Sequence, residues 1–209
     1  LQLGILTGRS IKAARYRYAE TQLPKPAVWI SQAGTEIYYG DENKSDIFWQ
    51  DSIAVDWNRK GIEKVLFDLK DYLELQPLEQ QGPYKVSYIL KESGDAILPL
   101  VRKRLRQSGY PATPHLKCHW YLDIVPLRAS RAEAIRFLSL RWCLALDNVL
   151  IVASQQGDAE LIKGLTKSVV PGAHDSSLDG LRSHQRVFFS DGQDSLVDGL
   201  KHFRFLKSF

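Results

Sequence analysis

The stretch VLIVASQQGDAEL, Val149 to Leu161, decides the fold of this chain. Its first four residues, Val149 to Val152, are all apolar, which is typical of a strand covered on both faces of a mostly parallel sheet. Ligands of open α/β sheets bind beyond the carboxyl ends of such strands. The polar residues from Ser154 to Ala159 are therefore expected where chemistry would take place.

Composition and charge narrow the class of protein. The 209 residues are 44% hydrophobic and 25% charged, which fits a globular chain with room for one large domain or a core with a smaller insert. The net charge of +4 is mild, and basic residues are scattered through predicted helices such as 101–107. We interpret them as a solvated helix face and not as a nucleic-acid site.

The compartment follows from the cysteines and the apolar runs. Cys118 and Cys143 are too few and too unpatterned for a disulfide framework or a zinc site, so we expect a reducing, cytoplasmic location. No apolar stretch is long enough to cross a bilayer. The sequence starts at Leu1 inside a predicted strand and contains no Met, so we expect it to be a piece of a longer polypeptide.

The first fifty residues predict a strand, a tight turn and a helix. An apolar run at 1–6 ends in Thr7-Gly8-Arg9-Ser10, and 11–20 has helical character. A threonine hydroxyl and backbone N–H groups at such a point can bind an anion, although an ordinary helix cap explains the same residues equally well. A second apolar strand at 28–31 leads into a turn at Gly34.

Residues 51–126 have a pattern that differs from the parallel α/β core and predicts a separate α+β module. Apolar residues at helical spacing indicate two helices, and alternation indicates two half-buried strands. Such an α+β module, inserted between two parts of a parallel α/β core, is typical of a cap domain. The helix stripes contain Ile62, Val65, Leu66, Leu69 and Leu73, then Ile97, Leu100, Val101 and Leu105, and the strands alternate at Tyr84, Val86, Tyr88 and Leu90, then at Trp120, Leu122 and Ile124.

The core pattern returns after Pro126. A helix is predicted from about Ser130, and a shorter one at about 158–164 follows the strand at Val149. Two short apolar segments follow near 168–170 and 186–189, and a final helix at about 195–203 completes an α/β fold. The predicted domains are the first part of the core at 1–50, the cap at 51–126 and the second part of the core at 127–209.

Five blocks of the sequence together resemble the sucrose-6-phosphate phosphatase family. They are similar above all to the phosphatase-like domain at the C-terminus of sucrose-phosphate synthases. The resemblance implies a haloacid-dehalogenase-like parallel-sheet core with an inserted cap, and a first core strand that is absent from this chain. That strand is expected between the strands at 1–6 and 149–153, supplied by a preceding segment or a second chain. The blocks are LTGRS, ISQAGTEIYYG, PYKVSYIL, YLDIVPLRASRAEAIRFLSLRW and VLIVASQQGDAEL.

The resemblance implies a lost phosphatase site. Active members use a D-x-D nucleophile and acid, a lysine and Mg²⁺. Thr7 and Gly8 match the phosphate-binding second motif, and Arg131 falls at the lysine. Gln155 and Ala159 replace the two metal-binding aspartates, and Mg²⁺ prefers anionic oxygen ligands. The D-x-D pair has no counterpart, so we expect no catalytic residue, no metal and no cofactor here.

The sugar side of the site is better preserved under the same resemblance. Gly34, Thr35 and Glu36 match the block that reaches toward the sugar from beneath the cap. Lys85 and Tyr88 match cap positions that face the cleft, although such residues more often form a solvated strand face. Two interpretations stay open for Asp123, a buried structural carboxylate or an acceptor for a sugar hydroxyl.

Two hypotheses of function remain. The first is a catalytically inactive sucrose-6-phosphate phosphatase-like domain of a sucrose-phosphate synthase, whose glycosyltransferase domain moves glucose from UDP-glucose to fructose 6-phosphate. Its role would be structural, docking or sugar-phosphate sensing. Its expected partners are that glycosyltransferase domain and weakly bound sucrose 6-phosphate or sucrose, and neither nucleic acid nor membrane. The second is a Mg²⁺-dependent phosphatase truncated before its nucleophile strand. Gln155 and Ala159 favour the first, because truncation cannot explain substitutions inside the chain.

Overall fold

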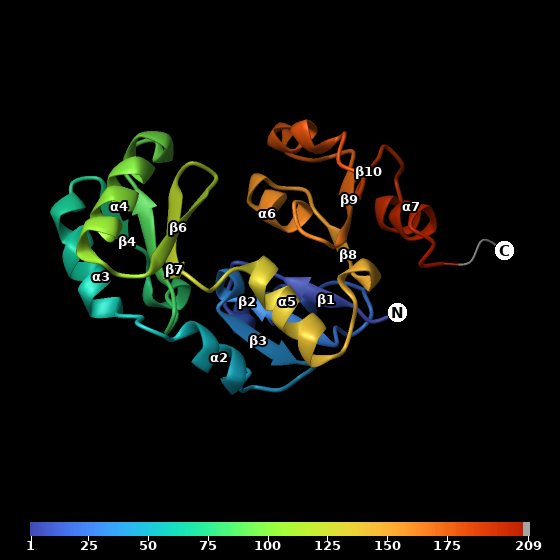
Figure 1. The fold of residues 1–209 in the computed structure, drawn as a ribbon, viewed down its shortest axis with the longest axis horizontal. Helices are drawn as coiled ribbons and strands as arrows, with labels where there is room; N and C mark the ends of the chain where they lie inside the picture. The colour runs from blue at the N-terminus through green and yellow to red at the C-terminus, as the bar shows by residue number, and fades with distance from the viewer. Residues whose placement is uncertain (207–209) are drawn as a thin grey trace. The chain divides into compact units, whose positions relative to one another are not determined.

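The structure, a computed structural model, describes residues 1–206 except for the side chain of Gln156. The chain divides into two compact units, Leu1–Ala134 and Ile135–Phe209. The first unit contains two sheets and the second contains one (Figure 1). The cap boundaries predicted at 50/51 and 126/127 stay predictions, while all strands of the larger sheet in the first unit lie within 73–126.

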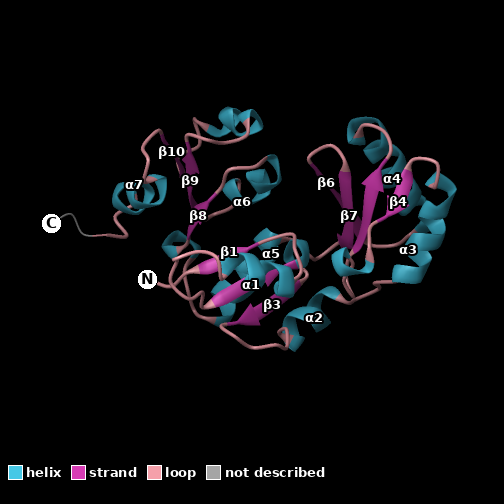
Figure 2. Cartoon of the chain, turned by 180° about the vertical axis from the view of Figure 1, so that it is seen from behind, coloured by secondary structure: helices cyan, strands magenta, loops and turns pink. Residues whose placement is uncertain are grey.

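A three-stranded sheet opens the first unit. β1 (Gly4–Leu6) pairs in parallel with β2 (Val28–Ser31), and β2 pairs antiparallel with β3 (Glu36–Tyr39). α1 (Ile11–Tyr18) begins at Ser10, whose Oγ accepts a hydrogen bond from the backbone N–H of Ala13. The helix lies against one face of the sheet (Figure 2), where Ala14 packs with the buried rings of Trp29 and Tyr38.

A four-stranded antiparallel sheet forms the rest of the first unit. Its strand order is β4-β5-β7-β6. The amphipathic helices α3 and α4 cover one face (Figure 1), and buried aliphatic side chains fill the space between. Strand alternation sends Val86, Tyr88 and Leu90 into this core and Ser87 toward the other face. The bounds are β4 (Leu73–Leu75), β5 (Val86–Leu90), β6 (Ala112–Lys117), β7 (Tyr121–Pro126), α3 (Arg59–Leu66) and α4 (Gly94–Ser108).

Several local predictions for this sheet were wrong. The helical stripe does not run on to Leu73, because α3 ends at Leu66 and Leu73 begins β4. Trp120 lies in a turn and is 52% exposed, and Leu100 on α4 is 43% exposed instead of facing the core. β6 was not predicted from the sequence, because Pro114 interrupts its strand pattern. α2 (Ile47–Ile53) was not predicted either, because seven residues are too few to show the helical repeat of apolar side chains.

The second unit holds a parallel sheet of order β10-β9-β8. α7 packs on β9 closely enough that a Cβ added at Gly199 would lie 2.8 Å from Val169 Cβ. α5 (Arg131–Arg141) crosses the boundary between the units. The other bounds in the second unit are β8 (Leu150–Val152), β9 (Lys167–Pro171), β10 (Val187–Ser190), α6 (Ala159–Ile162) and α7 (Ser195–His202). Its short 3-10 turns are Leu146–Asn148, Gln156–Asp158 and Ser176–Leu181, and those of the first unit are Gln32–Gly34, Phe67–Leu69 and Leu78–Gln80.

The strand at Val149 is shorter and less covered than its sequence predicts. β8 spans only Leu150–Val152; Ile151 is buried, while Val152 is 50% exposed. Among the described residues β1 and β8 are each the edge of their own sheet. The prediction that another strand lies between them stays a prediction.

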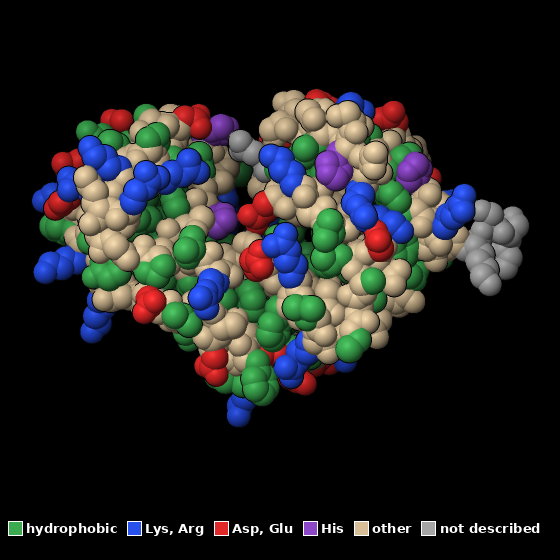
Figure 3. Space-filling view, in the orientation of Figure 1, with side chains coloured by type: hydrophobic (Ala, Val, Ile, Leu, Met, Phe, Trp, Pro, Cys, Tyr) green, Lys and Arg blue, Asp and Glu red, His purple; other side chains and the backbone are tan. Residues whose placement is uncertain are grey.

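The surface over the cap helices is basic. In Figure 3, Lys and Arg side chains form a row across the part of the molecule that contains α4, where Arg102, Lys103 and Arg104 are exposed. These side chains lie on the solvent side of a helix whose other side is buried. Within residues 1–206, no helix has the length and apolar character needed to span a membrane.

Candidate functional site

The site begins at the turn after β1. The backbone N–H of Thr7 donates to Ile30 O (2.8 Å), and Thr7 O accepts from the backbone N–H of Ala33 (3.2 Å). Thr7 Oγ1 accepts from the backbone N–H of Arg9 (3.1 Å). A hydroxyl that accepts one hydrogen bond still carries a proton to donate. The turn is therefore held firmly and keeps an O–H donor beside Gly8.

The turn between β2 and β3 has an unusual backbone. Gln32, Ala33 and Gly34 have φ values of 50°, 62° and 98°, a region that non-glycine residues rarely adopt. Gly34 meets the start of α5 so closely that an added Cβ would lie 2.5 Å from Arg131 N and 2.6 Å from Ser130 O. Gly34 thus positions Arg131, and Trp49 Nε1 fixes the turn by donating to Gly34 O (3.0 Å).

Two polar side chains of the predicted sugar block are buried. Thr35 Oγ1 donates to Gln32 O (3.0 Å) and so closes the turn. The Glu36 carboxylate accepts from Ser31 Oγ (3.2 Å) and Tyr38 OH (3.0 Å). Burial raises the pKa of Glu36, and these two hydroxyls and the charge of Lys85 oppose the rise. Glu36 is thus a buried acceptor within electrostatic reach of the cap lysine.

Three charged side chains on or next to strands of the four-stranded sheet come together near the turn at Thr7 and Gly8. Asp123 on β7 is 2% exposed and accepts from Ser87 Oγ (2.7 Å) and from Lys117 Nζ. Lys85 Nζ lies 3.8 Å from Asp123 Oδ1 and donates to Gly8 O (3.4 Å). Lys117 Nζ lies against Gly8, where an added Cβ would be only 2.5 Å away. Residues of the cap and of the turn at Thr7 and Gly8 therefore form one cluster within the first unit.

The cluster places two lysines beside two acids. Burial alone would raise the pKa of Asp123, but Lys117 and Lys85 outweigh it and hold that pKa below its usual value. Burial lowers the pKa of Lys85 to about 8, against the attraction of Asp123 and Glu36. The amino groups of both lysines lie beside the backbone of Gly8, where a charged ammonium group can attract an anion.

The structure brings most of the predicted site residues of the first unit together. Lys85, Asp123 and Glu36 approach the turn at Thr7 and Gly8, as described above. The prediction that Tyr88 faces the cleft was wrong, because Tyr88 is 5% exposed and packs in the core beneath α3 and α4. Tyr88 lies three positions after Lys85, and side chains an odd number of positions apart on a strand point to opposite faces.

Two residues of the cluster were missed from the sequence. Lys117 and His115 lie on β6, on the same face as Asp123. Burial lowers the pKa of His115 to about 4, and Arg131 and Arg102 add to the effect, so His115 is neutral at pH 7. Alternation of His115 and Lys117 around Leu116 was the available signal, which Pro114 concealed.

The loop after β8 does not fit a magnesium ion. Asp158 Oδ2 accepts hydrogen bonds from the backbone N–H groups of Ser154 and Gln155, both at 3.0 Å. Ala159 has no ligand atom, and Gln155 offers a neutral amide on an exposed side chain. The remaining carboxylate thus stabilises its own loop. Among the described residues, no three His, Cys, Asp or Glu side chains are grouped so that they could hold a metal ion.

Comparison with known proteins shows the family of this chain and its fold. A family model described as sucrose-6F-phosphate phosphohydrolase matches residues 1–204. The chain belongs to this family. A solved structure of the sucrose-phosphatase from Synechocystis, in complex with sucrose and phosphate, matches with a TM-score of 0.88 and 22% identity, over 99% of this chain and 86% of that one. The haloacid-dehalogenase-like α/β fold predicted from the sequence is thereby confirmed.

Curated relatives of this chain include proteins named as sucrose-phosphatase and sucrose-phosphate synthase. Sucrose-phosphatase 1 of Nicotiana tabacum is 30% identical over 74% of this chain and 37% of its own length. A probable sucrose-phosphate synthase of Arabidopsis thaliana is 26% identical over 78% of this chain and 17% of its own. A protein of Nitrosococcus oceani named as a haloacid-dehalogenase-like hydrolase is 29% identical over 83% and 50%. The chain therefore spans half or less of these relatives.

Anion binding at the cluster should weaken as pH rises. Sulfate carries the same charge from pH 7 to 9, whereas Lys85 loses its proton around pH 8. We expect sulfate affinity to fall about tenfold over this range, since the charged fraction of Lys85 falls by that factor. Calorimetric titration measures it, with Lys85→Met as the control that binds more weakly and without this pH dependence. Equal sulfate affinities at pH 7 and pH 9 in the unchanged chain would show that Lys85 does not contribute to anion binding at the cluster.

Proposed function

We propose that this chain is a catalytically inactive, sucrose-6-phosphate phosphatase-like domain that binds a sugar phosphate in its first unit. The observation that supports inactivity is the loop at 154–159. Gln155 and Ala159 stand where the family resemblance expects two metal-binding aspartates, and Asp158 bonds backbone N–H groups instead. Mg²⁺ in near-octahedral geometry needs hard, preferably anionic oxygens, which this loop does not offer it.

Binding is supported by the charges at Gly8. Lys85 and Lys117 with the Thr7 hydroxyl suit a phosphate group. Asp123 and Glu36 suit sugar hydroxyl groups, because a buried carboxylate is a strong acceptor. In this proposal Asp123 has both of the roles left open above. It is a buried structural carboxylate that pairs with the lysines, and it can still accept a hydrogen bond from a sugar hydroxyl.

The biological role that we propose is sensing or docking within a cytoplasmic sucrose-phosphate synthase. The similarity to part of such enzymes supports this role. In it, the domain holds sucrose 6-phosphate or sucrose weakly and contacts the glycosyltransferase domain of its parent chain. Weak binding suits a sensor, because its occupancy then follows the ligand concentration near the dissociation constant.

The proposal predicts no Mg²⁺-dependent hydrolysis of sucrose 6-phosphate. We expect phosphate release more than about a hundredfold slower than the usual enzyme range of roughly 1 to 1000 per second. The double variant Gln155→Asp with Ala159→Asp should gain Mg²⁺ affinity, which calorimetry detects, but no turnover. Phosphate release within about a hundredfold of that range by the unchanged chain would refute inactivity.

Sugar-phosphate binding is tested separately. Titration of the chain with sucrose 6-phosphate should give saturable heat at millimolar ligand or below, because the phosphate and the sugar each have polar partners in the first unit. The variant Lys117→Met is expected to bind at least about tenfold more weakly, since it removes one charge-assisted contact. A titration without heat would reject the sensing role and leave docking.

A further inference from the structure

The side-chain oxygen of Gln32, in the turn between β2 and β3, is a buried polar atom without a hydrogen-bond partner among the described residues. Gln32 is 4% exposed. Its side-chain oxygen Oε1 is buried, and no described residue hydrogen-bonds to it. Buried polar atoms are nearly always paired, so such an orphan needs a physical explanation.

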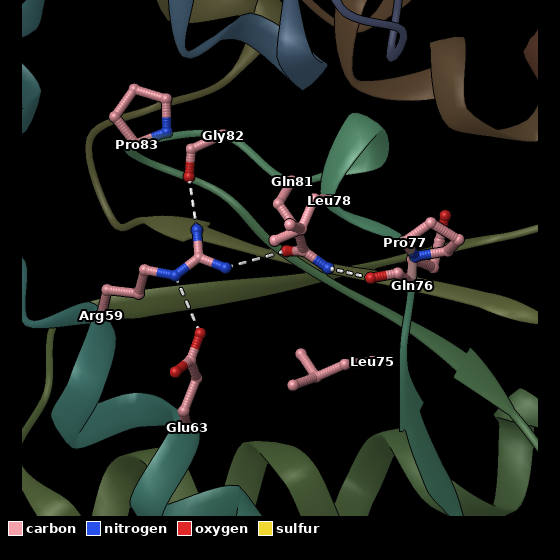
Figure 4. A pocket seen from close by; sticks show the side chains of 9 residues that line it. All are labelled: Arg59, Glu63, Leu75, Gln76, Pro77, Leu78, Gln81, Gly82 and Pro83. Atoms are coloured by element: carbon pink, nitrogen blue, oxygen red, sulfur yellow. Dashed lines mark hydrogen bonds and ion pairs between the residues drawn. The ribbon is translucent and has the colours of Figure 1, made fainter.

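The orientation of this amide is fixed by its surroundings. Gln32 Nε2 donates to the backbone carbonyl of Gln81 (3.1 Å), which can only accept, so Oε1 must be the opposite atom. Gly82 allows the close approach, since an added Cβ would lie 3.3 Å from both the Cδ and the Nε2 of Gln32. The loop that bears Gln81 is itself held by Arg59, whose guanidinium donates to Gln81 Oε1 (3.1 Å) and Gly82 O (2.6 Å) (Figure 4).

Gln32 lies next to both halves of the candidate site. Its backbone N–H donates to Arg9 O (2.9 Å), one residue beyond Gly8. Its partner residue Gln81 accepts from the backbone N–H of Ser87 (2.9 Å), and Ser87 Oγ donates to Asp123. Hydrogen bonds therefore connect Gln32 both to the turn at Thr7 and Gly8 and, through Gln81 and Ser87, to the ionic cluster.

The strained backbone supports a role in binding. Gln32 and the following Ala33 both adopt positive φ values, at 50° and 62°. Such conformations persist when the surroundings enforce them, and they concentrate at functional sites. The hydrogen bond to Gln81 O holds the Gln32 side chain in one direction before any ligand arrives, which lowers the entropy cost of binding.

We propose that Gln32 Oε1 accepts a hydrogen bond from a hydroxyl of the bound sugar phosphate and so selects a polyhydroxylated ligand over a bare anion. This inference rests on the proposed sugar-phosphate function and adds a specificity-determining residue to it. The amide oxygen of Gln32 favours a hydroxyl because it can accept a hydrogen bond but cannot donate one, whereas phosphate at neutral pH presents mostly acceptors.

The test compares two ligands by calorimetry, sucrose 6-phosphate and inorganic phosphate. Gln32→Met keeps the length of the side chain but removes the acceptor, so affinity for sucrose 6-phosphate should fall about tenfold. Affinity for inorganic phosphate should change less than about twofold, because phosphate does not reach Oε1. The matched control is Gln76→Met, which also removes an Nε2 bond to a backbone carbonyl, that of Tyr88 (3.1 Å), and should change neither affinity.

A second variant guards against misfolding. Gln32→Glu keeps an acceptor at the same reach, so the ratio of the two affinities should survive even if both decline. Unchanged binding of sucrose 6-phosphate by Gln32→Met, or a parallel loss of both ligands, would overturn the inference and leave Gln32 a structural residue. If the unchanged chain binds neither ligand, the proposed function fails as well, and the two failures are thus distinguished.

Discussion

Gly34→Ala is expected to destabilise the protein by about 3 kcal/mol or more, from backbone strain together with overpacking. The φ of Gly34 is +98°, and the new Cβ would lie 2.5 Å from Arg131 N and 2.6 Å from Ser130 O. These are backbone atoms of a helix start, so they cannot rotate away as a side chain would. Urea denaturation followed by circular dichroism measures the loss in the free energy of unfolding.

The control for this change is Gly109→Ala. Gly109 has a φ of +74° at the end of α4, but no heavy atom lies within 4 Å of an added Cβ. It should cost only the conformational strain, on the order of 1 kcal/mol. Equal losses at the two positions would show that the approach of Gly34 to α5 is loose, and that the β2–β3 turn does not position Arg131.

Asp123→Ala is expected to cost about 3 to 5 kcal/mol, because it removes the ion-pair partner of a buried lysine. The Lys85 side chain is 3% exposed and has Asp123 as its ion-pair partner, whereas Lys117 is 36% exposed and can turn toward water. Urea denaturation at pH 7 measures the loss. The double variant Asp123→Ala with Lys85→Met should recover much of it, because the unpaired ammonium is then gone.

The single variant Asp123→Ala should become more stable as pH rises. The pKa of Lys85 is already lowered to about 8 with Asp123 present, and removal of the carboxylate lowers it further. Below the unfolded value of about 10.4 the unfolded state then binds more protons than the folded state, so stability rises with pH. A variant equally unstable from pH 7 to pH 9, or as stable as the unchanged chain, would show that Lys85 does not depend on Asp123.

Regular patterns made much of the fold predictable. β2 and the starts of α1 and α7 lie where apolar periodicity and turn residues placed them. The failures concern elements whose period is too short or interrupted. β4 has three residues, and Leu73 continued the stripe of α3 in register by chance, so periodicity alone could not separate helix from strand.

The candidate site was predictable only in part, for a physical reason. The family resemblance predicted that Thr7, Gly8 and Lys85 belong to one ligand-binding site, and the structure brings them close together. Lys117 was out of reach because its role depends on the register between β6 and β7, a contact between segments that sequence spacing does not encode. The orphan oxygen of Gln32 likewise exists only because two separate loops enclose it.

Pro114 has a consequence beyond hiding β6 from the sequence. β6 and β4 are the two edges of the four-stranded sheet, and exposed edges invite strands of other molecules to pair with them. A proline offers no N–H to an incoming strand, and β4 is only three residues long. Both borders of the cap are thus poor templates for intermolecular β-pairing, which protects the lysine-bearing sheet from self-association at high protein concentration.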